Sequence, residues 1–336
     1  MSSPITQKKV LVTGAAGFIA SHVVSHCLKL GFKVTATDNL SGGFAENIPA
    51  EAEFICGDLR DHTFVHSLWQ DRAYDVVYHL GAYAAEGLSH FVRRFNYETN
   101  LVASVNLINE SVNNGVSLFV FTSSIAVYGA AQTPMTESMI PRPEDPYGIS
   151  KYAVELDLAA AHELFGLNFT IFRPHNVYGE RQNIADKYRN VIGIFMNQAL
   201  QGEPMTVFGD GSQTRAFSYI DDVAPIIAKA PLIPEACNQI FNIGADTPTS
   251  VANLAEEVAR SLNLPCNIKL LPARNEVVHA FSDHTKVRDV FSASSHVDLA
   301  TGLARMAQWV KGKGYASPVK FKDIEIPQGL PISWRS

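Results

Sequence analysis

A glycine-containing turn near the N-terminus places the strongest limit on how this chain can fold. A short apolar run at residues 10–12 leads into Thr13, and Gly14 and Gly17 then precede an apolar helical pattern that ends before Gly31. Glycines at these places permit a tight turn, and they allow backbone N–H groups to approach a pyrophosphate at the start of a helix. The segment therefore predicts a strand, a phosphate-binding turn and a helix in direct succession.

Strands and helices continue to alternate through the first half of the chain. Further strand-like runs are expected at residues 33–37, 53–56, 75–78, 118–121 and 168–172. Helical patterns stand between or before them, at residues 18–30, 61–70 and 99–114. Because parallel strands need crossover connections, this order predicts an α/β fold with a doubly wound, Rossmann-like parallel sheet.

Polar residues stand where four of the expected strands end, at Asp38, Asp58, His79 and Ser124. Ligands of doubly wound sheets bind beyond the carboxyl ends of the strands, so we expect these side chains to share one crevice. Asp38 would accept hydrogen bonds from both hydroxyls of a ribose and would repel a 2′-phosphate, and residues 39–43 contain no arginine. The cofactor predicted from this pattern is NAD rather than NADP, with Asp58 within reach of the adenine amino group.

Tyr147 and Lys151 stand four residues apart, directly after the helix-start signal Pro146. This spacing places both side chains on one face of a helix. A free tyrosine has a pKa of about 10, and lowering the pKa to about 7 requires about 4 kcal/mol from nearby cations. We expect Lys151 and a second cation, such as oxidised nicotinamide, to supply this energy. Ser124 would donate to a substrate oxygen beside Tyr147 and complete an acid–base group.

Composition excludes several other classes of protein. The formal charge is −6 and charged residues make up 18% of the chain, so no basic face for nucleic acid is expected. No apolar run reaches the length of about 20 residues that spans a membrane. The four cysteines and the histidines show no spacing typical of metal sites or disulfides, which predicts a cytoplasmic protein without a bound metal.

These features together resemble the extended short-chain dehydrogenase/reductase family, and within it the NAD-dependent nucleotide-sugar epimerases, UDP-glucose 4-epimerases above all. The resemblance extends from Lys9 to about Val290. It is carried by four stretches, at residues 12–19, 121–129, 147–151 and 173–179. Two departures stand out: Ala20 replaces the third glycine of the turn, and the loop 83–87 matches no known role.

The resemblance implies roles for individual residues. Tyr147 would be the catalytic base, Lys151 its partner and a ligand of the nicotinamide ribose, and Ser124 a hydroxyl donor. Asn100 resembles the helix asparagine that helps to place the lysine. The expected NAD contacts are Gly14, Gly17, Phe18, Ile19, Asp38, Asn39, Asp58, Leu59, Leu80, Ala82, Asn100, Tyr147 and Lys151. The resemblance also implies a homodimer.

By the same resemblance, the chain divides into an NAD-binding domain at residues 1–175 and a nucleotide-sugar-binding portion at residues 176–336. A strand near residues 239–243 would return to the first sheet, and residues 312–336 would pack as an extended strap. Arg215 and Arg274 would hold a diphosphate, because guanidinium groups match phosphate oxygens. Ala280 would lie beside carbon 2 of the sugar, where it leaves room for an N-acetyl group. The full set of expected substrate contacts is Ser124, Asn176, Asn190, Val191, Thr206, Phe208, Arg215, Arg274 and Ala280.

The residues after Ser124 separate the reactions that run on this scaffold. Dehydratase relatives carry an acidic pair where this chain has Ile125 and Ala126, and decarboxylase relatives need a glutamate at the place of Ala126. We therefore expect oxidation and re-reduction of a UDP-hexose at carbon 4. A UDP-N-acetylhexosamine or a UDP-uronate epimerase, a net dehydrogenase and an NAD-sensing scaffold remain alternatives. Arg181, Lys187 and Arg189 would favour a uronate, whereas Glu86 would repel one.

Overall fold

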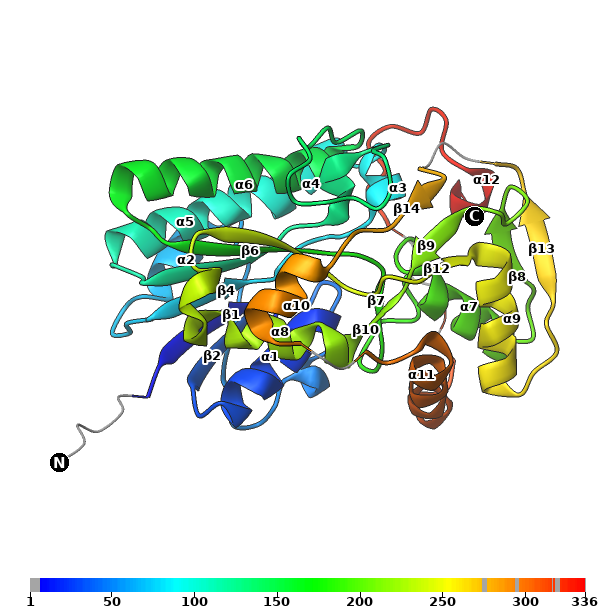
Figure 1. Ribbon diagram of the computed structural model, residues 1–336, viewed down its shortest axis with the longest axis horizontal. Helices are drawn as coiled ribbons and strands as arrows, with labels where there is room; N and C mark the ends of the chain where they lie inside the picture. Colours follow the sequence, from blue (N-terminus) through cyan, green and yellow to red (C-terminus); the bar gives the residue numbers. More distant parts are fainter. Residues whose placement is uncertain (1–6, 274–276, 294–295, 316, 318–320, 336) are drawn as a thin grey trace.

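Seven parallel strands form the central sheet, in the order β11-β6-β5-β4-β1-β2-β3 (Figure 1). The computed structural model describes residues 7–273, 277–293, 296–315, 317 and 321–335. The strands are β1 Lys9–Thr13, β2 Lys33–Asp38, β3 Glu53–Cys56, β4 Val76–His79, β5 Leu118–Thr122, β6 Phe169–Pro174 and β11 Gln239–Ile243. The order reverses between β1 and β4, which opens a crevice at their carboxyl ends. The predicted doubly wound sheet is confirmed.

Alternate residues of each strand pack into two separate cores. In β1, Val10 and Val12 belong to the core under α1 (Phe18–Lys29) and α8 (Ala224–Lys229). Leu11 instead belongs to the core under α2, α5 and α6. The bounds of these helices are α2 His62–Ser67, α5 Ala103–Asn113 and α6 Pro146–Phe165. Apolar residues on both faces of the strands explain why the strand patterns appear continuous rather than alternating.

Two helices of the first half differ from the predicted bounds. The predicted helix at residues 61–70 is shorter: it begins after its N-cap Asp61, which accepts from the backbone N–H of Thr63, and it ends at Ser67. The predicted helix at residues 99–114 begins as one π-helical turn, Glu98–Val102, before α5. The loop at residues 83–87, which had no assigned role, leads into the short helix α3 Glu86–Ser89, and a second short helix, α4 Arg93–Tyr97, follows.

The substrate-side portion lies beyond the carboxyl ends of the sheet and contains only small sheets, as Figure 1 shows. Its strands are β7 Val177–Tyr178, β8 Met205–Phe208, β9 Thr214–Ala216, β10 Ser218–Tyr219, β12 Pro248–Ser250, β13 Ile268–Leu271 and β14 His279–Ala280. Its helices are α7 Val191–Leu200, α9 Val251–Leu262, α11 Leu299–Lys313 and α12 Ile332–Arg335, whereas α10 Thr285–Phe291 packs against β11 of the central sheet.

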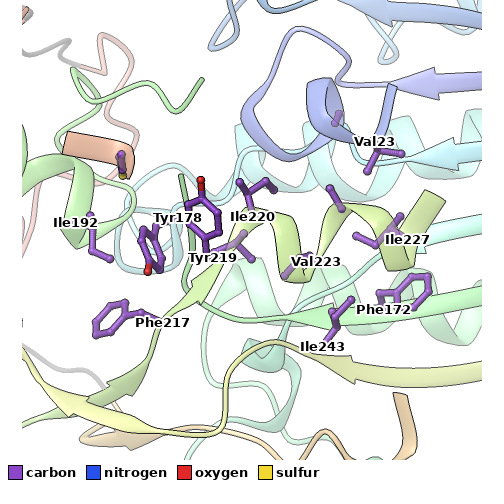
Figure 2. Packing of buried hydrophobic residues seen from close by; sticks show 14 of the residues in the cluster. Val23, Phe172, Tyr178, Ile192, Phe217, Tyr219, Ile220, Val223, Ile227 and Ile243 are labelled. Carbon is purple, nitrogen blue, oxygen red and sulfur yellow. The ribbon is translucent and has the colours of Figure 1, made fainter. Parts of the chain in front are cut away.

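One continuous core joins the two portions. Figure 2 shows Ile192, Phe217 and Tyr219 on the substrate side in the same cluster as Val23 and Phe172 of the first sheet. α8 packs against α1, and β11 pairs in parallel with β6, as the sequence predicted for residues 239–243. The chain therefore crosses the boundary near residue 175 more than once, and the division into two domains stays a proposal.

The C-terminal segment packs over the loop that follows β4. Phe321 and Trp334 join a cluster with Tyr83, Leu88 and other residues of α3 and α4. The Glu325 carboxylate also accepts the backbone N–H groups of Arg94 and Phe95. The predicted strap is thus extended only in part, because α11 precedes it and α12 ends it. Within the described ranges, no helix is both long and apolar enough to span a membrane.

Candidate active site

A cavity of about 820 Å³ lies at the carboxyl ends of the central strands and extends between the sheet and the substrate-side portion. It gathers nearly all of the predicted site residues. On the cofactor side these are Gly14, Gly17, Phe18, Ile19, Asp38, Asn39, Asp58, Leu59, Leu80, Ala82, Tyr147 and Lys151. On the substrate side they are Ser124, Asn176, Asn190, Val191, Thr206, Phe208, Arg215 and Ala280. Asn100 is not part of the described lining, and Arg274 lies outside the described residues.

The turn after β1 leaves no room for side chains. Gly14 has a φ of +68°, and a Cβ atom there would lie 2.6 Å from the Cα atom of Gly81. A Cβ atom on Gly43 would lie 2.4 Å from the carbonyl carbon of Ala16, so the loop after β2 folds onto the same turn. The backbone of the turn is thereby exposed to a ligand at the start of α1, and a dinucleotide diphosphate fits this cradle.

Asp38 ends β2 beside this cradle. Its carboxylate accepts the backbone N–H groups of Ala16 at 3.1 Å and Leu40 at 2.7 Å. Burial raises the pKa of Asp38 above that of a free aspartate, and these hydrogen bonds partly oppose the shift. A carboxylate held at this place fits the ribose of NAD.

Asp58, at the end of β3, is paired with an arginine that the sequence reasoning did not consider. Arg60 donates to both carboxylate oxygens of Asp58, and Asn39 donates to the second of them at 3.1 Å. The hydrogen bond from Arg60 is the main reason that the pKa of Asp58 falls to about 2. The Arg60 guanidinium is paired with Asp58 and is therefore not available to a 2′-phosphate. Arg60 thus leaves the expectation of NAD rather than NADP unchanged.

Tyr147 lies buried in the first turn of α6. The helix begins there because Asp145 is its N-cap, accepting the Gly148 N–H at 2.9 Å, and because Pro146 occupies the first turn. Burial raises the pKa of Tyr147 well above the ordinary value, and a hydrogen bond with Ser124 opposes the shift. The protein's own groups therefore do not produce the lowered pKa that the sequence predicted.

Lys151 lies one turn further along α6, and its Nζ atom is 5.9 Å from the centre of the Tyr147 ring. Its Nζ atom donates to the carbonyl oxygen of Thr122 at 2.9 Å and lies 4.7 Å from the centre of the Phe121 ring. Burial lowers the pKa of Lys151 to about 7, against an opposing effect of Glu155. A lysine with this pKa is partly protonated at neutral pH, and its role as the partner of Tyr147 stays a prediction.

Asn100 makes hydrogen bonds with the loop beside the cavity, and the role that the resemblance implied for it stays a prediction. It is buried in the π-helical turn before α5, where its Oδ1 atom accepts the Tyr83 N–H at 2.8 Å and its Nδ2 atom donates to the Tyr83 carbonyl. It also donates to Asn96 at 2.8 Å. None of its described hydrogen bonds reaches Lys151. Asn100 therefore holds the loop beside the cavity.

His79 connects the glycine turn to the same π-helical turn. Ser104 donates to the carbonyl of Asn100 at 2.7 Å, so it accepts from His79 Nε2 at 2.8 Å. His79 Nδ1 then accepts from Thr13, which in turn accepts the N–H of Gly81. Burial lowers the pKa of His79 to about 3, so the ring is neutral and one tautomer satisfies every bond. The sequence correctly indicated that His79 ends a strand, but it did not indicate the hydrogen-bond partners Thr13 and Ser104, which lie on other elements.

A buried ion pair fixes α6 against the sheet. Arg173 at the end of β6 donates to both carboxylate oxygens of Glu155, one of them at 3.0 Å, and Ser123 donates to the same carboxylate. Glu155 lies one turn after Lys151. The sequence reasoning did not single out Glu155, although its spacing of four residues from Lys151 could have indicated it.

His175, which follows β6 and lines the cavity, is also held by distant partners. Its Nδ1 atom donates to the Ala216 carbonyl at 3.0 Å, and its Nε2 atom lies 3.0 Å from Nε2 of His284. His284 Nδ1 lies 2.6 Å from the carboxylate of Asp246. Burial lowers the pKa of His175 to about 3. No group of three or more metal-ligating side chains gathers here or elsewhere in the described chain.

On the substrate side, Asn190 begins α7 with a φ of +57° and accepts the Ile192 N–H at 3.3 Å. Arg215 in β9 donates to the carbonyl oxygens of Val277 at 2.6 Å and Val278 at 2.9 Å. Its guanidinium thus holds the segment before β14, and a contact with a diphosphate stays a prediction. Ala280 in β14 lines the cavity and also packs in a small core with Ile125, and its place beside carbon 2 of the sugar stays a prediction.

Comparison with known proteins agrees with this geometry. Residues 10–244 match the family model described as the NAD dependent epimerase/dehydratase family. The chain belongs to this family. Its predicted fold, its NAD cofactor and its nature as an enzyme of the epimerase class are thereby confirmed.

Members of the family that resemble this chain act on different UDP-sugars. It is 33% identical over 313 residues to the UDP-glucose 4-epimerase of Mycolicibacterium smegmatis, covering 91% of this chain and 99% of that one. The UDP-N-acetylglucosamine 4-epimerase of Methanobrevibacter ruminantium, with UDP-N-acetylmuramic acid, is 31% identical with a TM-score of 0.82, covering 91% and 99%. The UDP-glucuronic acid 4-epimerase of Bacillus cereus, with UDP-glucuronic acid and NAD, is 28% identical with a TM-score of 0.83, again covering 91% and 99%.

Proposed function

We propose that this enzyme inverts carbon 4 of a UDP-hexose by transient oxidation to a 4-keto sugar. The observation that carries the proposal is the meeting of Ser124, Tyr147 and Lys151 with the glycine turn in one cavity, next to the apolar residues Ile125 and Ala126. An acid or base at those two positions would favour elimination or decarboxylation. With apolar side chains there, the simplest chemistry is proton and hydride exchange at one carbon.

Tyr147, as the phenolate, takes the proton of the sugar's 4-hydroxyl, and Ser124 donates a hydrogen bond to the same oxygen. NAD, when bound, would accept the hydride and return it, and its positive nicotinamide would be the second cation that favours the phenolate. Rotation of the keto sugar in the pocket would expose its opposite face, and Tyr147 would then return the proton to the sugar oxygen. No net oxidant is consumed. Loose binding of the hexose and firm binding of the diphosphate permit this rotation.

The test is incubation of the purified protein with UDP-glucose or UDP-galactose without added NAD. Formation of the 4-epimer, with no free NADH, supports the proposal. Stoichiometric release of NADH with an oxidised sugar would support a net dehydrogenase instead. If neither the 4-epimer nor NADH forms, the result would support an NAD-sensing scaffold.

A second candidate substrate is a UDP-N-acetylhexosamine. The small side chain of Ala280 supports it, because this residue lines the cavity and leaves space that a larger residue would fill.

We also propose that the protein forms a homodimer. Its support is a set of exposed apolar side chains on α6, at Leu156, Leu164 and Phe165, and sedimentation of the purified protein tests it.

A further inference from the structure

One segment of the substrate-side portion, residues 181–190, lies across the loop that covers the glycine turn. Asn47 donates to the carbonyl oxygen of Arg181 at 3.2 Å, and Asn183 donates to that of Gly42 at 3.4 Å. A guanidinium nitrogen of Arg189 lies 3.1 Å from the position that a Cβ atom on Gly42 would occupy. Because the same loop folds onto the turn through Gly43, this segment reaches the cofactor side of the cavity.

The side chain of Arg189 is held in place from two sides. Its Nε atom donates to Asp186 at 2.6 Å, and its guanidinium carbon lies 4.8 Å from the centre of the Tyr83 ring. Tyr83 is itself fixed by the two hydrogen bonds of Asn100. Arg189 lines the cavity and its side chain is only 23% exposed. The remaining donors of its fork, on the two terminal nitrogens, have no hydrogen-bond acceptor among the described residues.

The other described cations of the cavity wall are already engaged by protein groups. Arg60 is bound to Asp58, and Lys151 donates to Thr122. Arg181 donates to the Ser21 carbonyl and to the Ser25 hydroxyl of α1. Arg215 donates to the carbonyls before β14. The turn itself, from Gly14 to Phe18, contains no cation. The two negative charges of a dinucleotide diphosphate would therefore lack a cationic partner on the sheet.

We propose that Arg189 binds the diphosphate of NAD from the substrate side of the cavity. The planar guanidinium matches two phosphate oxygens, and fixing it in advance against Tyr83 and Asp186 lowers the entropy cost of that contact. Asn190 and Val191 follow directly and begin α7, which lines the substrate side.

The experiment compares Arg189→Gln and Arg189→Lys with the control Arg94→Gln, which removes the same charge from an exposed arginine outside the cavity. Gel filtration of each holoenzyme, followed by acid release of NAD, measures how much cofactor is retained. Titration of the stripped proteins with NAD, ADP-ribose and adenosine measures the affinities. We expect NAD and ADP-ribose to bind at least about 10-fold more weakly to Arg189→Gln, because a charge-assisted bond is lost. Adenosine, which has no phosphate, should bind unchanged.

Arg189→Lys should retain part of the affinity for NAD, because it keeps the positive charge. It should not restore all of it, because the ammonium group lacks the paired N–H donors of guanidinium. Equal melting temperatures of the three stripped variants would show that folding does not account for the loss. The proposal is overturned if both Arg189 variants bind NAD and ADP-ribose like the control. An increase in KM for UDP-glucuronate alone would then assign Arg189 to a sugar carboxylate. The proposal depends on NAD as the cofactor, and its binding tests hold whichever sugar is epimerised.

Discussion

Lys151 lies four residues after Tyr147 in α6, yet its Nζ atom is 5.9 Å from the centre of the tyrosine ring and donates to Thr122. Burial shifts the two pKa values apart, raising that of Tyr147 and lowering that of Lys151 to about 7. Burial thus opposes the charged form of each group. The positive charge of a bound, oxidised nicotinamide would favour the phenolate, as the proposed mechanism requires.

Replacing Tyr147 by phenylalanine should reduce kcat by about 10²–10⁴-fold, the range typical of a lost acid–base group. The amount of NAD that copurifies should stay the same, because the ring remains. Epimerisation assays and NAD release after acid treatment measure the two effects. A variant with near-normal kcat would contradict the proposed role of Tyr147.

Removing the buried amine should change the pH dependence of stability. The folded chain lowers the pKa of Lys151 from about 10.5 to about 7, so this residue's contribution to stability is fully present above pH 10.5 and lost as the pH falls toward 7. We expect NAD-free Lys151→Met to gain stability relative to wild type at pH 6, by up to roughly 5 kcal/mol. At pH 10 the gain should shrink. Urea unfolding at both pH values measures the difference, and an equal gain at both would contradict the assigned burial effect.

The neutral ring of His79 predicts sensitivity to acid. Its folded pKa of about 3 lies below the unfolded value of about 6.5, so its contribution is fully present above pH 6.5 and is lost as the pH falls toward 3. Between pH 6.5 and 5 the loss amounts to about 2 kcal/mol. His79→Asn should therefore be less stable at pH 7 but lose less on acidification. The exposed His62→Asn is the matched control, and both are compared with wild type by urea unfolding.

Introducing a tyrosine at position 280 should act on substrate choice. If Ala280 adjoins carbon 2 of the sugar, Ala280→Tyr excludes UDP-N-acetylglucosamine at least about 10-fold more than UDP-glucose, because an acetamido group needs the space of the new ring. The ratio of kcat/KM for the two substrates measures this. An unchanged ratio, with the variant folded, would show that the side chain serves only the small core around Ile125.

Several features of the fold followed directly from local sequence patterns. Neighbouring residues alone indicate the strand and turn at Gly14, the strand end at Asp38 and the start of α6 at Pro146, although the distant Gly81 is what leaves no room for a side chain at Gly14. The return of β11 to the first sheet also agreed with the sequence, because an apolar strand between loops has few other places to pair. Helix bounds agreed less well where capping decided them, as at Asp61.

The sequence by itself determined which chemical groups meet: a phosphate-binding turn, a ribose-binding acid and a tyrosine with a serine at the carboxyl ends of parallel strands. Strand period, helix period and the crossover rule are local or topological, so a single chain displays them. Only the tertiary structure decided the state of those groups. Desolvation set the pKa of Tyr147 and Lys151, and partners more than a hundred residues away engaged His175. The packing of residues 181–190 over Gly42 oriented Arg189. These effects depend on which distant atoms exclude water from a site, and spacing along the chain carries no record of that.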